Sequence, residues 1–257
     1  MEMEQVRLDI KEENYAVLTL QRSAKMNAVT RQMTRELKEA LNQVSSEHTL
    51  KFLVITGEGE RAFCTGGDLN EFHGDMSADE AYNLLRPMME VLHQLATLPI
   101  PVIALLNGQA RGGGCEIATA CDFRYGRKES KFGFVQGNLG ITPGWGGGAL
   151  LYQRLTSGNA AHWLMDAEMY EAERTLHIGW LHKISSLEDI KGLKDIQPFL
   201  NKTAAQMRVF KKQLLKESFP EDLYERMEEE VRLCSELWET EEHKLAVEKF
   251  MSTRKNL

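Results

Sequence analysis

The sequence predicts an α/β fold in which a layered core is followed by a helical C-terminal region. In the first half of the chain, short apolar runs that suit buried strands alternate with longer segments of helical periodicity. Beyond Gly147 the strand signals almost disappear, and charged amphipathic helical patterns replace them. A chain of 257 residues, 42% hydrophobic and 27% charged, can bury the core that such a fold needs. We therefore divide it into a core of residues 1–190 and a helical region of residues 191–257.

The first half of the chain alternates between strand-like and helix-like periodicity in its apolar residues. Alternation of period two indicates strands, and apolar residues three or four positions apart indicate helices. Proline ends the second helix, because it cannot donate the next intrahelical hydrogen bond. The expected elements are a hairpin of residues 6–10 and 15–21, a helix over 30–44, a strand over 52–56, a helix over 78–98 ended by Pro99 and Pro101, and then a strand, a helix and a strand over 102–106, 113–120 and 123–125.

The second half is predicted to be almost entirely helical. We expect short helices over residues 149–155, 160–165 and 172–180, and amphipathic helix from residue 187 onward. Residues 221–249 carry an excess of acidic side chains on a helical pattern, which is most simply a solvated face.

The charge balance limits the partners of the protein. A net charge of −7 opposes nonspecific attraction to nucleic acid and to anionic membranes. The acidic, mixed N-terminus does not resemble a secretory signal, and no apolar run approaches the length of a bilayer span. We therefore expect a cytoplasmic protein with no nucleic-acid partner and no membrane partner.

Two glycine-rich junctions are the most informative features of the chain. One covers residues 62–69 and the other residues 112–116, and each follows an apolar strand-like run and leads into a segment of helical character. The first N–H groups of a helix have no intrahelical partner, and glycine allows a ligand to approach them closely. Two such junctions that converge would hold one oxyanion from two sides. Taken singly, each glycine cluster is also explained as a tight turn.

The four cysteines do not indicate a metal site. Cys64, Cys115, Cys121 and Cys234 form no C-x-x-C pair and have no histidines at zinc-binding spacing. Cys64 and Cys115 lie in the two glycine junctions, which raises the question of a nucleophilic role. We favour the simpler interpretation that both are reduced thiols packed under tight turns.

Several segments together resemble the crotonase (enoyl-CoA hydratase/isomerase) superfamily. They are both glycine junctions and residues 20–28, 120–124 and 139–147, in this order and spacing. The resemblance implies a crotonase-like superhelix of repeated ββα turns, an acyl-CoA thioester substrate, and no cofactor other than the coenzyme A of that substrate. It implies a thioester enolate stabilised by the backbone N–H groups of Gly67 and Gly113. It also implies a homotrimer, or two stacked trimers as a hexamer, with contacts through the helical region.

The resemblance also identifies Glu116 and Gln136 as candidate catalytic residues. Glu116 lies in the first helical turn after Gly113, where the helix dipole favours a carboxylate. Hydratases of this superfamily carry the first of two catalytic glutamates here and the second in a Phe-Gly-x-Pro-Glu segment. This chain has Phe132-Gly133-Phe134-Val135-Gln136 instead, so an amide replaces the second glutamate. An amide cannot act as an ordinary general acid or base near neutral pH.

The loss of that glutamate favours decarboxylation over hydration. Two glutamates in a closed pocket would repel a substrate that carries its own carboxylate, and a neutral amide relieves that repulsion. Loss of CO₂ from a malonyl-type thioester gives the same enolate. Residues 140–147 also resemble the ethylmalonyl-CoA/methylmalonyl-CoA decarboxylase branch. There, Trp145 replaces a residue that is small in hydratases, and it is either a wall of the acyl pocket or part of the core.

By resemblance, further residues are expected to bind the substrate. The loop at residues 25–28 and the backbone of residues 62–67 would flank the nucleotide and the pantetheine, and C-terminal side chains would close over coenzyme A. The predicted substrate-binding residues are Lys25, Ala28, Ala62, Cys64, Gly66, Asp68, Leu69, Trp145, Phe250 and Lys255.

Three other interpretations stay open at this point. Residues 144–149 formally match the G-x-G-x-x-A dinucleotide fingerprint, but Pro143 stands where an uninterrupted strand should end. A noncatalytic or RNA-binding relative of the crotonases is opposed by the acidic balance and by the retention of Glu116. Among enzymes, the alternative is a hydratase or isomerase in which Glu116 acts alone.

Overall fold

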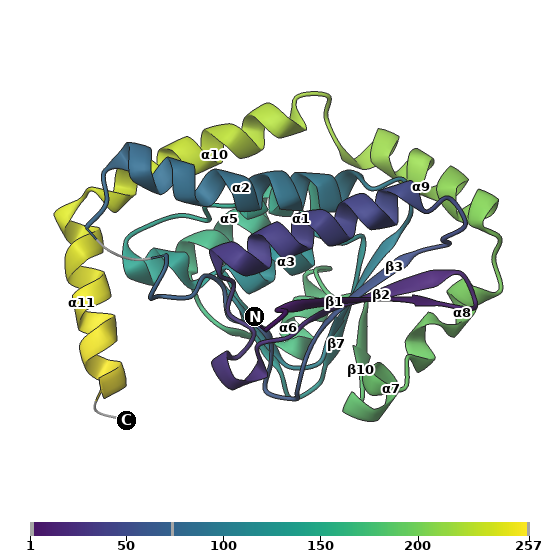
Figure 1. Cartoon of the computed structure of the whole chain (residues 1–257). Coiled ribbons are helices and arrows are strands. Elements are labelled where there is room, and N and C mark those ends of the chain that lie inside the picture. The colour runs from purple at the N-terminus through teal and green to yellow at the C-terminus, as the bar shows by residue number, and fades with distance from the viewer. Residues whose placement is uncertain (1–2, 73–74, 256–257) are drawn as a thin grey trace.

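A computed structural model of the chain describes residues 3–72 and 75–255, and it confirms the α/β class. The strands form two sheets, and Figure 1 shows the long helices α1 (Arg31–Ser46), α2 (Ala78–Thr97) and α10 (Leu223–Trp238) lying across one side of them. No helix in the described part of the chain is long and apolar enough to cross a membrane.

The larger sheet has six strands in the order β1-β2-β3-β5-β7-β10. The first two form the predicted antiparallel hairpin, with Asn14 at a φ of 63° in its turn, and the remaining neighbours are parallel. Every side chain of β2 and β5 is buried, as expected for central strands covered on both faces. The bounds are β1 Val6–Lys11, β2 Tyr15–Leu20, β3 Leu53–Gly57, β5 Val102–Leu106, β7 Phe123–Arg127 and β10 Lys183–Ser185.

The smaller sheet was not predicted. Its four strands are two or three residues long, which is too short for a period-two pattern to be recognised. They follow the order β4-β6-β8-β9, with bounds β4 Ala62–Cys64, β6 Gln109–Arg111, β8 Lys131–Gly133 and β9 Tyr170–Glu171. The two glycine junctions therefore follow β4 and β6, not the larger-sheet strands β3 and β5 as expected.

Along the chain, the short strands β4 and β6 follow the long strands β3 and β5. The sequences β3-β4-α2 and β5-β6-α3 (Gly113–Ala120) are two turns of a repeated ββα unit, as the resemblance implied. Side-chain caps define the starts of the first long helices: Thr30 accepts a hydrogen bond from the Met33 N–H, and Ser77 forms a capping box with Glu80.

Helices cover most of the second half of the chain, as predicted, but strand β10 of the larger sheet was not predicted there. One boundary was wrong: the helix expected over residues 172–180 ends at His177, because Gly179 adopts a φ of 86°. The bounds are α4 Gly147–Arg154, α5 Ser157–Asp166, α6 Ala172–His177, α7 Leu187–Lys191, α8 Gln197–Leu200, α9 Ala204–Ser218 and α11 Glu241–Lys255, with 3-10 turns η1 Ser23–Lys25, η2 Val135–Leu139 and η3 Lys194–Ile196.

Helix α10 joins the C-terminal region to the core. It packs along α2 and against α4, and its apolar face belongs to the same buried cluster as the strands of the larger sheet. Figure 1 shows α11 leaving α10 at the edge of the molecule. A domain boundary near residue 190 stays a prediction, because residues on both sides share one apolar interior.

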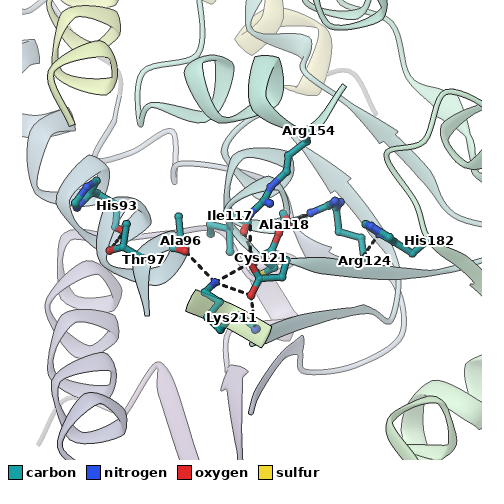
Figure 2. Close-up of polar contacts among 12 residues, drawn as sticks. His93, Ala96, Thr97, Ile117, Ala118, Cys121, Arg124, Arg154, His182 and Lys211 are labelled. Carbon is teal, nitrogen blue, oxygen red and sulfur yellow. Dashed lines mark hydrogen bonds and ion pairs between the residues drawn. The ribbon is translucent and has the colours of Figure 1, made fainter. Parts of the chain in front are cut away.

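A buried ion cluster also joins α9 to the core (Figure 2). Lys211 donates to both oxygens of Asp122, at 2.7 and 2.6 Å, and to the Ala96 carbonyl at 3.0 Å. Asp122 also accepts a hydrogen bond from the Val102 N–H at 2.8 Å and lies 3.4 Å from Arg154. The Lys211 and Asp122 side chains are completely buried. This cluster holds together elements that are more than a hundred residues apart.

A buried arginine completes the C-terminal end of α3. Arg124 donates to the carbonyls of Ala118 and Cys121, at 3.3 and 2.6 Å, and to that of Trp180 at 2.6 Å. A cation in this position adds a donor to carbonyls at the end of the helix and complements the helix dipole. Helix α3 is thus fixed at the end away from the candidate site.

Candidate active site

A cavity of about 640 Å³ lies where the two glycine junctions meet. Its walls come from the N-terminal part of α3, η2, the loop before α4, α10 and α11, together with the loops after β2 and β4. Most residues that the sequence singled out line this one cavity: Lys25, Ala28, Gly66, Gly67, Asp68, Leu69, Gly113, Glu116, Gln136, Trp145 and Phe250.

Three predicted substrate-binding residues are placed differently. Ala62 lines a smaller cavity of about 300 Å³, which shares Ala24 and Met26 with the larger one. Cys64 is completely buried in β4 and does not line the larger cavity. The side chain of Lys255 lies outside the described residues.

The buried thiols are not suited to nucleophilic attack. Burial raises the pKa of Cys64 to about 12 and the pKa of Cys115 well above its ordinary value. Both thiols are therefore neutral at neutral pH, whereas the attacking species would be a thiolate. The prediction that these cysteines are packed under the glycine turns is confirmed.

The two candidate donors lie at adjoining backbone segments. Gly113 is the first residue of α3, and a Cβ atom built on Gly66 would lie only 3.0 Å from the Gly113 nitrogen. Gly66 and Gly112 have φ values of 87° and 50°, which favour glycine. Among the described residues, neither the Gly67 N–H nor the Gly113 N–H donates a backbone hydrogen bond. Both groups are therefore available to a ligand in the cavity.

The expectation of a helix after each junction is correct only for the second. Gly67 is followed by a turn, in which the Phe72 N–H donates to the Asp68 carbonyl at 2.8 Å, and α2 begins only at Ala78. A salt bridge that the sequence did not indicate holds this turn: Arg22 lies 2.9 Å from Asp68 and donates to the Ala28 carbonyl at 2.6 Å. Of the two junctions in the described residues, the second alone leads directly into a helix, α3.

Glu116 is held by three N–H donors. Its Oε2 accepts hydrogen bonds from the backbone of Trp145 at 2.9 Å and Gly147 at 3.0 Å, and its Oε1 accepts one from the Gln136 Nε2 at 2.8 Å. Its exposed fraction is 2%. Burial raises the pKa of Glu116 to about 7 despite these donors, which stabilise the anion. The carboxyl is therefore poised to hold or release a proton near neutral pH.

Gln136 is oriented by Glu116 and leaves an acceptor free. It lies in η2, buried against the Gly112 backbone, with its Nε2 directed at Glu116. Within the described part of the chain, its Oε1 is buried and has no hydrogen-bond partner. Such a group is costly unless a ligand or water satisfies it, so the amide is a candidate contact for a polar substrate group.

Trp145 is both a core residue and a wall of the cavity. A Cβ atom on Gly113 would lie 2.0 Å from its Cζ3, so the indole covers the α-carbon of that glycine. Phe72 meets the indole edge-on, with ring centroids 5.8 Å apart. Trp145 is 3% exposed and lines the cavity. The two roles that the sequence offered for it are therefore compatible.

The glycine run at residues 146–148 is not a dinucleotide fingerprint. It opens α4, and the N–H groups there are already occupied: those of Trp145 and Gly147 by Glu116, and those of Gly148 and Ala149 by Glu230 of α10. A pyrophosphate would need these same donors.

Contrary to what the sequence led us to expect, the acidic side chains of residues 221–249 do not all face solvent. Glu230 of α10 points at α4 and binds its backbone N–H groups.

A comparison with known families agrees with this geometry. The sequence profile of the family described as enoyl-CoA hydratase/isomerase matches residues 11–257. The chain belongs to the enoyl-CoA hydratase/isomerase, or crotonase, family. The protein is therefore an acyl-CoA-processing enzyme of the crotonase superfamily.

Two similar relatives carry different activities in their names. Crotonyl-CoA hydratase of Syntrophomonas wolfei is 37% identical over 180 residues, which cover 70% of this chain and 69% of that protein. Ethylmalonyl-CoA decarboxylase of Gallus gallus is 35% identical over 197 residues, which cover 76% of this chain and 66% of that protein. The match thus leaves about a third of the Gallus gallus protein uncovered.

Comparison with solved structures shows that this chain has the fold of the family. An enoyl-CoA hydratase from Mycobacterium avium subsp. paratuberculosis K-10 superimposes with a TM-score of 0.86, at 19% identity, over 98% of this chain and 97% of that one. The crotonase-like superhelix expected from the resemblance is therefore confirmed.

Proposed function

We propose that the protein removes CO₂ from a short-branched malonyl-CoA. The observation that carries this proposal is the contact between Gln136 and Glu116 in the cavity beside Gly113. The amide takes the position that the resemblance assigns to a second glutamate. Beside Gly113 a substrate carboxylate therefore meets one glutamate instead of two, and the second hydrogen of the Gln136 Nε2 can be donated to it.

The N–H groups of Gly67 and Gly113 would stabilise the product of carbon–carbon cleavage. When CO₂ leaves, the electron pair of the broken bond forms a thioester enolate, whose charge lies largely on the thioester oxygen. Two preorganised donors lower the energy of this anion more than that of the neutral thioester, and this difference accelerates the reaction. The absence of a competing backbone hydrogen bond from either N–H among the described residues supports this role.

Glu116 is the candidate proton donor to the enolate. With a pKa of about 7, it holds a proton on a substantial fraction of molecules at neutral pH. Its Oε2 is held by two backbone N–H groups, whereas the Gln136 amide at Oε1 can rotate, so we place the proton on Oε1. That proton passes to the α-carbon, and the resulting carboxylate takes another from solvent.

The alternative activity is hydration or isomerisation of an enoyl-CoA with Glu116 acting alone. The 37% identity to a crotonyl-CoA hydratase favours it. Incubation with methylmalonyl-, ethylmalonyl- and crotonyl-CoA, followed by mass spectrometry, separates the activities, because decarboxylation loses CO₂ and hydration gains water. Rapid hydration of crotonyl-CoA without loss of CO₂ from either malonyl thioester would overturn the decarboxylase proposal.

The variant Gln136→Glu should lower decarboxylation on the order of ten-fold or more and raise crotonyl-CoA hydration from a low base. A second carboxylate beside Glu116 repels the carboxylate of the substrate, and it restores the acid that hydration lacks. Both rates are measured on the same preparation. Gln43→Glu makes the same chemical change on the exposed side of α1 and should leave both rates unchanged. Full decarboxylation by Gln136→Glu would count against the proposed role of the amide.

We also propose assembly into trimers or hexamers through the helical C-terminal region. Several large apolar side chains there are more than half exposed in the single chain, which suits an interface: Val209, Phe210, Leu233 and Leu245. Sedimentation velocity at micromolar concentration is the measurement. A strictly monomeric enzyme that retains activity would refute this proposal.

A further inference from the structure

Two carboxylates from distant parts of the chain meet at the N-terminus of α4. Glu116 of α3 accepts hydrogen bonds from the N–H groups of Trp145 and Gly147. Glu230 of α10 accepts hydrogen bonds from the next two N–H groups, Gly148 at 3.1 Å and Ala149 at 2.6 Å. The N-cap residue of α4 supplies no side-chain cap, so these carboxylates complete the start of the helix.

The glycine run at the start of α4 fits this pair closely. A Cβ atom on Gly147 would lie 2.2 Å from the Cγ of Glu116, and one on Gly148 would lie 2.6 Å from the Oε2 of Glu230. Gly146 has a φ of 81°, and its Cβ would lie 2.5 Å from the Cε of Met227. Side chains at these positions would push both carboxylates away from the backbone, so the glycines are explained without any nucleotide.

The two carboxylates are attracted to the helix N-terminus but repel each other. Burial and, after it, the charge of Glu116 raise the pKa of Glu230 to about 8. This interaction is mutual, so a charged Glu230 must also favour the protonated form of Glu116. Cys234, also on α10, interacts with both carboxylates, and because burial raises its thiol pKa to about 12 it stays neutral.

We propose that Glu230 is a positioning residue of the reaction, which fixes the start of α4 and thereby Glu116, and that the mutual repulsion of the two carboxylates keeps one proton on the pair. Few residues separate the contacts of Glu230 from those of Glu116. Glu230 binds the N–H groups of Gly148 and Ala149, and the turn just before them presents the N–H groups that orient Glu116. Only the transfer of that proton to the enolate rests on the proposed function. The electrostatic coupling between the two carboxylates is independent of the reaction.

The test replaces Glu230 with glutamine, which keeps an acceptor but removes the charge. If Glu116 is the proton donor, turnover is lost as the pH rises through its pKa. Because Glu230 has the higher pKa, it is mostly protonated when Glu116 ionises. Glu230→Gln should therefore leave the alkaline limb of the pH–rate profile in place and lower kcat through the lost contact at the start of α4. Glu229→Gln removes a charge from the exposed neighbouring position and should change neither kcat nor the limb. Glu230→Asp keeps the charge but shortens the side chain, and should lower kcat with little movement of the limb.

A second measurement does not need turnover. The folded-state pKa of both carboxyls lies above the ordinary value of 4.5, so the stability they contribute is present below that value and is lost as the pH rises through about 7 to about 8. A double-mutant cycle of Glu116→Gln and Glu230→Gln in chemical denaturation should show repulsive coupling at about pH 9 and none at about pH 5.

The two measurements separate the possible failures. Coupling in the cycle together with no decarboxylation would overturn the proposed function and leave the carboxylate pair in place. Decarboxylation with no coupling at either pH, and with a kcat that neither Glu230→Gln nor Glu230→Asp lowers, would overturn the role of Glu230.

Discussion

Turnover is expected to fall by about 10²–10³-fold when residue 113 loses its N–H group. The sharpest comparison is between Gly113→Pro and Gly113→Ala, both made in a Trp145→Ala background. Alanine keeps the N–H and proline removes it, and proline is tolerated at the first position of a helix, where Gly113 lies. The rate on each accepted thioester is the measurement. Binding of a non-reactive CoA thioester serves as the control for folding.

The background substitution is required by the structure. The three atoms nearest to a Cβ on Gly113 all belong to the Trp145 ring, at 2.0, 2.4 and 2.7 Å, so any side chain at this position collides with the indole in the natural protein. Replacing the Gly113 amide with an ester by semisynthesis removes the same N–H with Trp145 in place. Equal turnover of the proline and alanine variants, or of the ester and the amide, would show that Gly113 is not an oxyanion donor.

The largest expected effect on stability comes from the buried ion cluster of Figure 2. Lys211→Met should lower the free energy of unfolding by about 3–5 kcal/mol, because it leaves the buried carboxylate of Asp122 without its closest cation. Arg154, at 3.4 Å, remains but makes a longer contact. Urea denaturation followed by circular dichroism measures the loss.

Two further variants test the origin of this loss. Lys212→Met removes a lysine from the exposed neighbouring position of α9 and should change stability by less than about 0.5 kcal/mol. Adding Asp122→Asn to Lys211→Met should recover part of the loss, since no buried charge is then left uncompensated. A Lys211→Met protein as stable as the natural one would mean that the pair contributes nothing to folding.

The two effects concern opposite ends of one short helix. The N-terminal end of α3 carries Gly113 and Glu116, while Arg124 binds carbonyls at its C-terminal end and Asp122 is the second residue after it. A helix fixed at one end by buried ionic contacts can hold donors at the other end in constant positions. Preorganisation of this kind is what an oxyanion site requires.

Much of the candidate site could be predicted from local sequence. The glycines at residues 66, 67, 112 and 113 and the acid three positions after Gly113 are short-range patterns, and the cavity does bring them together. The first long helices were equally visible, since the apolar periodicity of each lies within one segment. The second sheet was missed, because strands of two or three residues are defined by their partners and carry no period of their own.

The sequence by itself determined the α/β class, the positions of the glycine turns, and the presence of an amide at Gln136 where the resemblance expects a glutamate to accompany Glu116. Each of these depends on residues close together in the chain or on a motif of fixed order. Only the tertiary structure decided which charged side chains turn inward. Lys211 and Glu230 lie on amphipathic helices among other charged residues, where either would pass for a solvated side chain. Their partners, Asp122 and the start of α4, lie about eighty or more residues away, and only packing brings such distant groups into contact.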